Sequence, residues 1–115
     1  MTEYSPVYGG NGPYKQKSEA PAMNFGQAIE ALKAGKKVAR EGWNGTGMFA
    51  VYSPGKKQLA AADFFSPQLR EYAENALGGH MDVRPAFMLK TAQDDVAYWA
   101  PSGSDALAED WVIID

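Results

Sequence analysis

Aromatic side chains and arginines recur along the chain at places that could bind a planar, charged small molecule. A tryptophan or phenylalanine face can stack on a nucleobase, which contributes roughly 1–3 kcal/mol per base. An arginine fork suits phosphate oxygens, because it donates two parallel hydrogen bonds. The set comprises Arg40, Trp43, Phe49, Arg84, Phe87 and Trp99. Ser102 and Asp105 follow in a turn, where a carboxylate could accept hydrogen bonds from ribose hydroxyls.

The same aromatic residues have a structural explanation, since tryptophans and phenylalanines on strands also fill hydrophobic cores. Spacing alone does not separate the two interpretations. The glycines at 42, 45 and 47 match neither a P-loop nor a dinucleotide-binding motif, both of which need a following helix. A plain hairpin turn is therefore the favoured interpretation of these glycines.

Few residues of this sequence suit a metal site or a catalytic site. His80 and Asp82 are two residues apart, but a zinc site with one histidine and no cysteine would need several carboxylates. We therefore expect no metal and no cofactor. There is no Gly-x-Ser-x-Gly nucleophile elbow, and we predict no catalytic residue. Asp105, Glu109 and Asp110 leave a carboxylate-based hydrolase open, although acidic residues in a helical turn also complement the helix dipole.

Composition narrows the class of protein. A chain of 115 residues favours one domain, and a net charge of -3 argues against binding DNA or RNA polymers through a broad basic face. The absence of cysteine excludes disulfides and fits a reducing compartment. No apolar run approaches the roughly 18 residues of a membrane span, and the N-terminus lacks the apolar core of a signal peptide. We expect a cytoplasmic protein that does not bind membranes.

A helix and a hairpin must position the first candidates. Asn24–Ala34 has an apolar stripe at helical spacing, a capping residue at its start and a glycine after its end. Lys36–Tyr52 is predicted to form two strands joined by a glycine-rich turn. Arg40, Trp43 and Asn44 therefore crowd one end of this hairpin.

Residues 56–80 are predicted to be an insertion between two strands. Lys56 and Lys57 are predicted to lie in a loop at the start of this insertion. A second helix then begins, with Ser66 as its cap and Pro67 at its first helical position. The apolar stripe of this helix comprises Leu69, Tyr72, Ala73 and Ala76.

The remaining elements complete a small sheet. The strand candidates are Val83–Lys90, Val96–Ala100 and a buried closing strand from Trp111 to Ile114. Pro85 favours an edge or strand-start position for the first of them. Ser104 or Asp105 can cap a short helical turn, Ala106–Glu109. The predicted fold class is α+β: a mostly antiparallel sheet of about five strands with two main helices on one face.

Residues 1–22 differ in composition from the rest, with prolines, glycines and tyrosines but no helical or strand period. We predict an N-terminal arm, extended or flexible, before a single domain at 23–115.

Three blocks carry a resemblance to a known family. They are Met23–Gly35, Lys37–Gly47 with its Val-Ala-Arg-x-Gly-Trp-Asn-Gly motif, and Trp99–Ile113 with Trp-x-x-Ser-x-x-Asp-x-Leu-Ala-x-Asp-Trp. In this order they resemble the phage Thoeris anti-defence proteins of the first type, formerly a domain of unknown function. The resemblance covers most of residues 23–115, and leaves out residues 1–22 and about 56–80.

The resemblance implies a non-enzymatic protein that binds and sequesters cyclic ADP-ribose signals, such as glyco-cyclic ADP-ribose, made by bacterial TIR-domain proteins. Sequestration blocks activation of the Thoeris effector in the cytoplasm of the infected bacterium. Members of that family form homodimers with pockets at the subunit interface, some assemble into hexamers, and some also bind cyclic oligonucleotides. The motif residues and the strand aromatics and arginines together give the expected ligand-binding set: Arg40, Trp43, Asn44, Phe49, Arg84, Trp99, Ser102 and Asp105.

Two other functions remain open from the residues alone. One is a hydrolase that opens a cyclic nucleotide with carboxylates. The other is a structural or accessory phage module, in which every aromatic residue belongs to the core.

Overall fold

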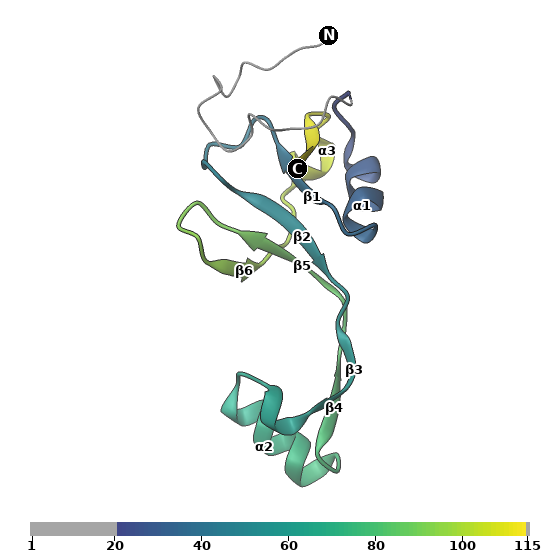
Figure 1. Ribbon diagram of the computed structural model, residues 1–115, viewed down its shortest axis with the longest axis vertical. Helices are drawn as coiled ribbons and strands as arrows, with labels where there is room; N and C mark the ends of the chain where they lie inside the picture. The colour runs from purple at the N-terminus through teal and green to yellow at the C-terminus, as the bar shows by residue number, and fades with distance from the viewer. Residues whose placement is uncertain (1–20, 115) are drawn as a thin grey trace. The chain divides into compact units, whose positions relative to one another are not determined.

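A computed structural model of the protein describes residues 21–114 (Figure 1). The chain divides into two compact units. Of the described residues, the sheet unit contains 21–52 and 87–114, and the hairpin unit contains Ser53–Ala86. The arm predicted for residues 1–22 lies, up to residue 20, outside the described residues.

The sheet unit is built on a five-stranded sheet. Its strands are β1 (Lys37–Arg40), β2 (Phe49–Ser53), β5 (Ala86–Lys90), β6 (Val96–Tyr98) and β7 (Trp111–Ile114). They lie in the order β6-β5-β2-β1-β7. β1 pairs antiparallel with both β2 and β7, and β5 pairs antiparallel with β6. The last strand of the chain thus lies beside the first, which brings the two ends of the sheet unit's sequence together.

Helix α1 (Phe25–Lys33) covers part of the sheet, alongside β1 and β7 (Figure 1). Its start is fixed by a capping box, in which Asn24 and Gln27 each accept a hydrogen bond from the other's backbone N–H. Ala28 and Leu32 are fully buried on its inner side. The helix predicted at 24–34 and the hairpin predicted at 36–52 are confirmed.

A short helix precedes the last strand. Helix α3 (Gly103–Leu107) is capped by Ser102, with Asp105 at the third helical position, where its carboxylate accepts a hydrogen bond from the Ser102 backbone N–H. The prediction of a turn at Ala106–Glu109 capped by Ser104 or Asp105 is therefore wrong by one turn. Ser102 is the cap, and the Asp105 carboxylate instead accepts hydrogen bonds from Arg40 and Trp43.

The core of the sheet unit lies mainly between α1 and the sheet. Trp111 and Val38 are fully buried there with Ala50 and the inner residues of α1. A second buried group, Ala39, Val112 and Ile114, lies on alternate positions of β1 and β7. Buried residues on both alternations of β1 and β7 explain why the closing strand has a continuous apolar sequence.

The hairpin unit is a two-stranded ribbon with a helix. β3 (Lys56–Ala60) pairs antiparallel with β4 (His80–Val83), and between them come a 3₁₀ turn, η3 (Ala61–Asp63), and α2 (Pro67–Ala76). Helix α2 begins as predicted, with Ser66 as cap, and packs on η3 and β4. The expectation that both main helices pack on one sheet is thereby corrected for α2.

Three local predictions in this region are also corrected. Lys56 and Lys57 lie in β3 and not in a loop. The strand expected at Val83–Lys90 is two strands, since Arg84 and Pro85 interrupt it and proline has no N–H for a ladder bond. Only Ala73 of the α2 stripe is buried.

The α+β class with a five-stranded antiparallel sheet and two main helices is confirmed. Among residues 21–114, no helix has the length and apolar composition that crossing a membrane requires.

Candidate functional site

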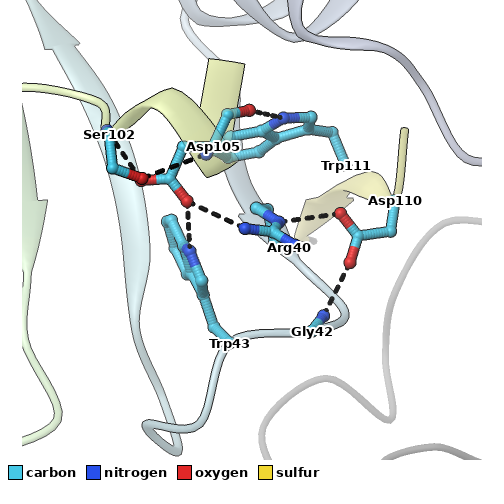
Figure 2. A network of polar contacts seen from close by, with 7 residues as sticks. All are labelled: Arg40, Gly42, Trp43, Ser102, Asp105, Asp110 and Trp111. Carbon is cyan, nitrogen blue, oxygen red and sulfur yellow. Dashed lines mark hydrogen bonds and ion pairs between the residues drawn. The ribbon is translucent and has the colours of Figure 1, made fainter. Parts of the chain in front are cut away.

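Arg40, at the end of β1, forms ion pairs with Asp105 and Asp110 from the C-terminal part of the sheet unit (Figure 2). Its Nε donates to Asp110 Oδ1 at 2.8 Å, and its Nη1 donates to Asp105 Oδ1 at 3.0 Å. The Arg40 side chain is 20% exposed, and those of Asp105 and Asp110 are 12% and 30% exposed. Hydrogen bonding to Asp110 raises the pKa of Arg40 more than burial lowers it. The guanidinium is a permanent charge held inside the fold.

Asp105 is the centre of this network. Its Oδ1 accepts a second hydrogen bond from Trp43 Nε1 at 3.1 Å, and its Oδ2 accepts one from the Ser102 backbone N–H at 3.2 Å. Its backbone carbonyl accepts from Trp111 Nε1 at 3.1 Å. Burial alone would raise the pKa of Asp105, but the hydrogen bonds from Trp43, Arg40 and Ser102 outweigh it and hold the pKa below its usual value. Asp105 is therefore a buried carboxylate that stays ionised.

Asp110 closes the turn after β1. Its Oδ2 accepts from the Gly42 backbone N–H at 2.8 Å, and its carbonyl accepts from the Glu41 backbone N–H at 3.0 Å. A Cβ on Gly42 would lie 2.9 Å from Asp110 Oδ2, so the carboxylate approaches where only glycine leaves room. Burial, and to a lesser extent the charge of Asp110, raises the pKa of Glu41 to about 7.

The three tryptophans form one cluster beside these charges. The Trp43 ring meets Trp111 at 5.3 Å and Trp99 at 6.1 Å between ring centroids, both edge to face. Trp99 and Trp111 are 5.9 Å apart, also edge to face. Phe25 and Phe87 extend the cluster on either side. Trp111 is fully buried, whereas Trp43 and Trp99 are only partly buried.

The structure brings five of the eight predicted site residues together. They are Arg40, Trp43, Trp99, Ser102 and Asp105. Each is linked to the network or to the tryptophan cluster by the contacts above. The motif blocks at 37–47 and 99–113, which are far apart in the sequence, thus meet in one site.

The other three predicted residues lie elsewhere. Asn44 is exposed in the turn that follows Trp43. Phe49 packs with the second buried group, and the ammonium groups of Lys37 and Lys90 lie 5.2 and 5.8 Å from its ring centroid. Arg84 is exposed in the hairpin unit, between β4 and β5. Their participation in ligand binding stays a prediction.

Sequence reasoning did not include Asp110 and Trp111 in the site. Asp110 was considered only as an acid, and Trp111 only as a buried strand residue. A signal was present, since an arginine on a short strand of otherwise apolar pattern needs carboxylate partners, and the chain's C-terminal block supplies two. Within residues 21–114, no three histidine, aspartate or glutamate side chains gather as metal ligands would.

Comparisons with known proteins show to which family the chain belongs. A family model described as a Tad2-like, Thoeris anti-defense 2-like domain matches residues 23–114. The chain is also 39% identical over 92 residues to a protein named Thoeris anti-defense 2 from Bacillus phage SP01, which covers 80% of this chain and 94% of that protein. The resemblance to Thoeris anti-defence proteins is confirmed, with the second type in place of the first. The match includes residues 56–80, which the resemblance had left out. The chain therefore belongs to the Tad2-like family of Thoeris anti-defense domains.

Proposed function

We propose that this protein binds and sequesters a TIR-generated cyclic ADP-ribose signal, such as glyco-cyclic ADP-ribose, without altering it chemically. It would act in the cytoplasm of the infected bacterium and keep the Thoeris effector from being activated. Membership of the Thoeris anti-defense family is the observation that carries the proposal. The tryptophan cluster supports the part of the proposal that concerns the adenine base.

A cyclic ADP-ribose carries an adenine and two phosphates. Trp43 and Trp99 are partly buried aromatic residues that suit the base, since stacking on an aromatic ring contributes roughly 1–3 kcal/mol. A stoichiometric trap must bind tightly, and submicromolar affinity corresponds to more than about 8 kcal/mol. Stacking alone does not reach that value, so the phosphates must be bound too.

The phosphates need cations beyond Arg40. Arg40 is already paired with Asp105 and Asp110, so this group of three side chains carries one negative charge in excess. We include a second copy of the chain as a source of positive charge. Enclosure between two preorganised subunits would also reduce the ordering cost of binding. Self-association as a homodimer or a larger assembly, and binding of cyclic oligonucleotides, belong to the same proposal.

The test separates sequestration from the two other functions. Purified protein is mixed with the TIR-made cyclic signal, the free signal is measured, and the complex is then heated. Depletion followed by release of intact signal is the expected result. Release of an opened product would instead indicate a hydrolase, and no depletion at all would reject both functions.

A matched pair of variants links the activity to the aromatic cluster. Trp99→Leu removes a ring that contacts Trp43, Trp111 and Phe87. Tyr98→Leu changes its neighbour, which is 77% exposed at the edge of the sheet. We expect depletion to fall at least tenfold for Trp99→Leu and to stay unchanged for Tyr98→Leu, with melting curves confirming that both are folded. Equal depletion by the two variants would place the ligand elsewhere.

The hydrolase has one observation in its favour. Burial and the nearby Asp110 raise the pKa of Glu41 to about 7, and a carboxyl group with a pKa close to neutral suits acid–base catalysis. Yet the carboxylates of Asp105 and Asp110 already accept hydrogen bonds from Arg40, Trp43 and Gly42, which gives both a structural role. We therefore keep the hydrolase as an outcome of the heating experiment.

A further inference from the structure

The indole N–H of Trp43 donates to a charged acceptor, the Asp105 carboxylate. Trp43 lies in the turn between β1 and β2, where its backbone N–H bonds to the Arg40 carbonyl at 3.2 Å. Its indole N–H donates to Asp105 Oδ1 at 3.1 Å. A tryptophan in a turn has several side-chain rotamers available, and a hydrogen bond to an ionised acceptor selects one of them. The edge-to-face contacts with Trp99 and Trp111 follow from that choice.

Asp105 can impose this orientation because it is itself held rigidly. Its backbone N–H donates to Ser102 Oγ at 3.0 Å, while its Oδ2 accepts from the Ser102 N–H. Its carbonyl accepts the indole N–H of the fully buried Trp111. Two tryptophan N–H groups from different elements therefore end on one residue (Figure 2).

The charge balance argues against direct ligand contact by this pair. Asp105 Oδ1 already accepts from Trp43 and from Arg40, and Arg40 is held by Asp110 as well. One guanidinium between two carboxylates leaves a net negative charge, which repels a phosphate. Asp105 and Arg40 thus have a role inside the fold that accounts for all the contacts described above.

We propose that Asp105, fixed by Arg40 and Ser102, is a positioning residue that sets the Trp43 ring for ligand stacking. Asp105 and Arg40 then influence ligand binding through Trp43 and not through contact with the ligand. This inference rests on the proposed function and deepens it. It replaces the sequence-based expectation that Arg40 meets phosphate and Asp105 meets ribose.

The first measurement needs no ligand. The protein has three tryptophans, so ¹⁵N labelling gives three indole N–H resonances. We expect Asp105→Ala to shift the Trp43 resonance by more than those of Trp99 and Trp111, because the Trp43 indole donates to the lost carboxylate, whereas the Trp111 indole donates to the backbone carbonyl, which alanine keeps. Removal of the acceptor shifts the Trp43 N–H even when the ring does not turn, so the orientation is read from the nuclear Overhauser contacts between the Trp43 and Trp99 rings, and unchanged contacts in the folded variant overturn the inference.

The second measurement is a double-mutant cycle with the purified TIR-made signal. Trp43→Phe keeps an aromatic ring but lacks the N–H that Asp105 accepts. We expect Asp105→Ala to weaken binding at least tenfold in the natural background and less than threefold in the Trp43→Phe background. An equal loss in both backgrounds would show that Asp105 contacts the ligand itself, and would overturn the inference.

Two points keep the tests decisive. If Asp105→Ala does not fold, Asp105→Leu takes its place, since leucine has a similar branched shape but no oxygen that could accept from Trp43. The same non-additivity is expected for it. If the natural protein does not bind the signal, the proposed function fails, whereas the resonance experiment still decides the positioning role.

Discussion

Replacing Glu41 by glutamine is expected to stabilise the sheet unit at alkaline pH. Burial and the nearby Asp110 raise the pKa of Glu41 from an ordinary 4.5 to about 7. A carboxyl group with a raised pKa binds its proton more tightly in the folded chain than in the unfolded chain. Its contribution to stability is complete below about pH 4.5 and is lost as the pH rises through 7. The ionised Glu41 thus opposes folding above neutral pH.

The size of the effect follows from the same change in pKa. A rise from 4.5 to about 7 corresponds to a ceiling of about 3 kcal/mol, since one pKa unit is 1.36 kcal/mol. Glu41 is only partly buried, and solvent screening lowers that ceiling. We expect Glu41→Gln to add about 1–2 kcal/mol to the free energy of unfolding at pH 8.5, and less than half of that at pH 5.

Urea denaturation followed by tryptophan fluorescence measures this gain. Trp43, Trp99 and Trp111 all lie in the sheet unit, so their emission reports the unfolding of that unit. Glu30→Gln, on the exposed side of α1, serves as the matched control substitution. The reasoning is refuted if Glu41→Gln and the natural protein lose stability in parallel between pH 5 and pH 8.5.

Two further substitutions test the packing. Trp111→Phe leaves the buried Asp105 carbonyl without its indole donor and leaves a cavity, so urea unfolding should show a loss of about 2–4 kcal/mol; a loss below about 1 kcal/mol would contradict the role of this bond. Gly55→Ala places a Cβ 2.3 Å from the Val83 carbonyl at a positive φ, and is expected to lower the free energy of unfolding by about 2–4 kcal/mol. Gly35→Ala is the control, with an expected loss of about 1 kcal/mol, because its φ is also positive but its Cβ would meet nothing within 4 Å. Melting curves compare the two glycines, with hydrogen exchange of β3 and β4 as the local measure, and equal losses would show that the close contact is unimportant.

Local signals in the sequence predicted much of the sheet unit. The capping pattern at Asn24 and the apolar stripe after it gave α1 to within one residue at each end. The run from Trp111 to Ile114 gave β7, because four consecutive apolar residues suit a strand buried on both faces. Such signals act over a few residues, and the structure did not override them.

Interactions between distant residues explain what the sequence did not show. Ser102 and Ser104 are both acceptable caps, and the bonds from Asp105 to Arg40 and Trp43, more than 60 residues away, accompany the choice of Ser102. β3 has no clear alternation of apolar residues. It forms by pairing with β4, with a bulge at Gln58, whose positive φ is supported by its N–H bond to Asp82 at 2.9 Å. Whether such a segment forms a strand is therefore determined by its pairing partner, here β4, and not by its own sequence pattern.

The pairing of β1 with β7 also affects how the protein is made. β1 leaves the ribosome early, but Arg40 must wait for Asp110, 70 residues later, before its charge is paired. The paired strands of the hairpin unit lie within residues 53–86, whereas the sheet unit cannot close until the C-terminal block has emerged. A prematurely terminated chain would therefore have no assembled tryptophan cluster. During infection, the interval between the start of translation and the first functional molecules would include the synthesis of nearly the whole chain.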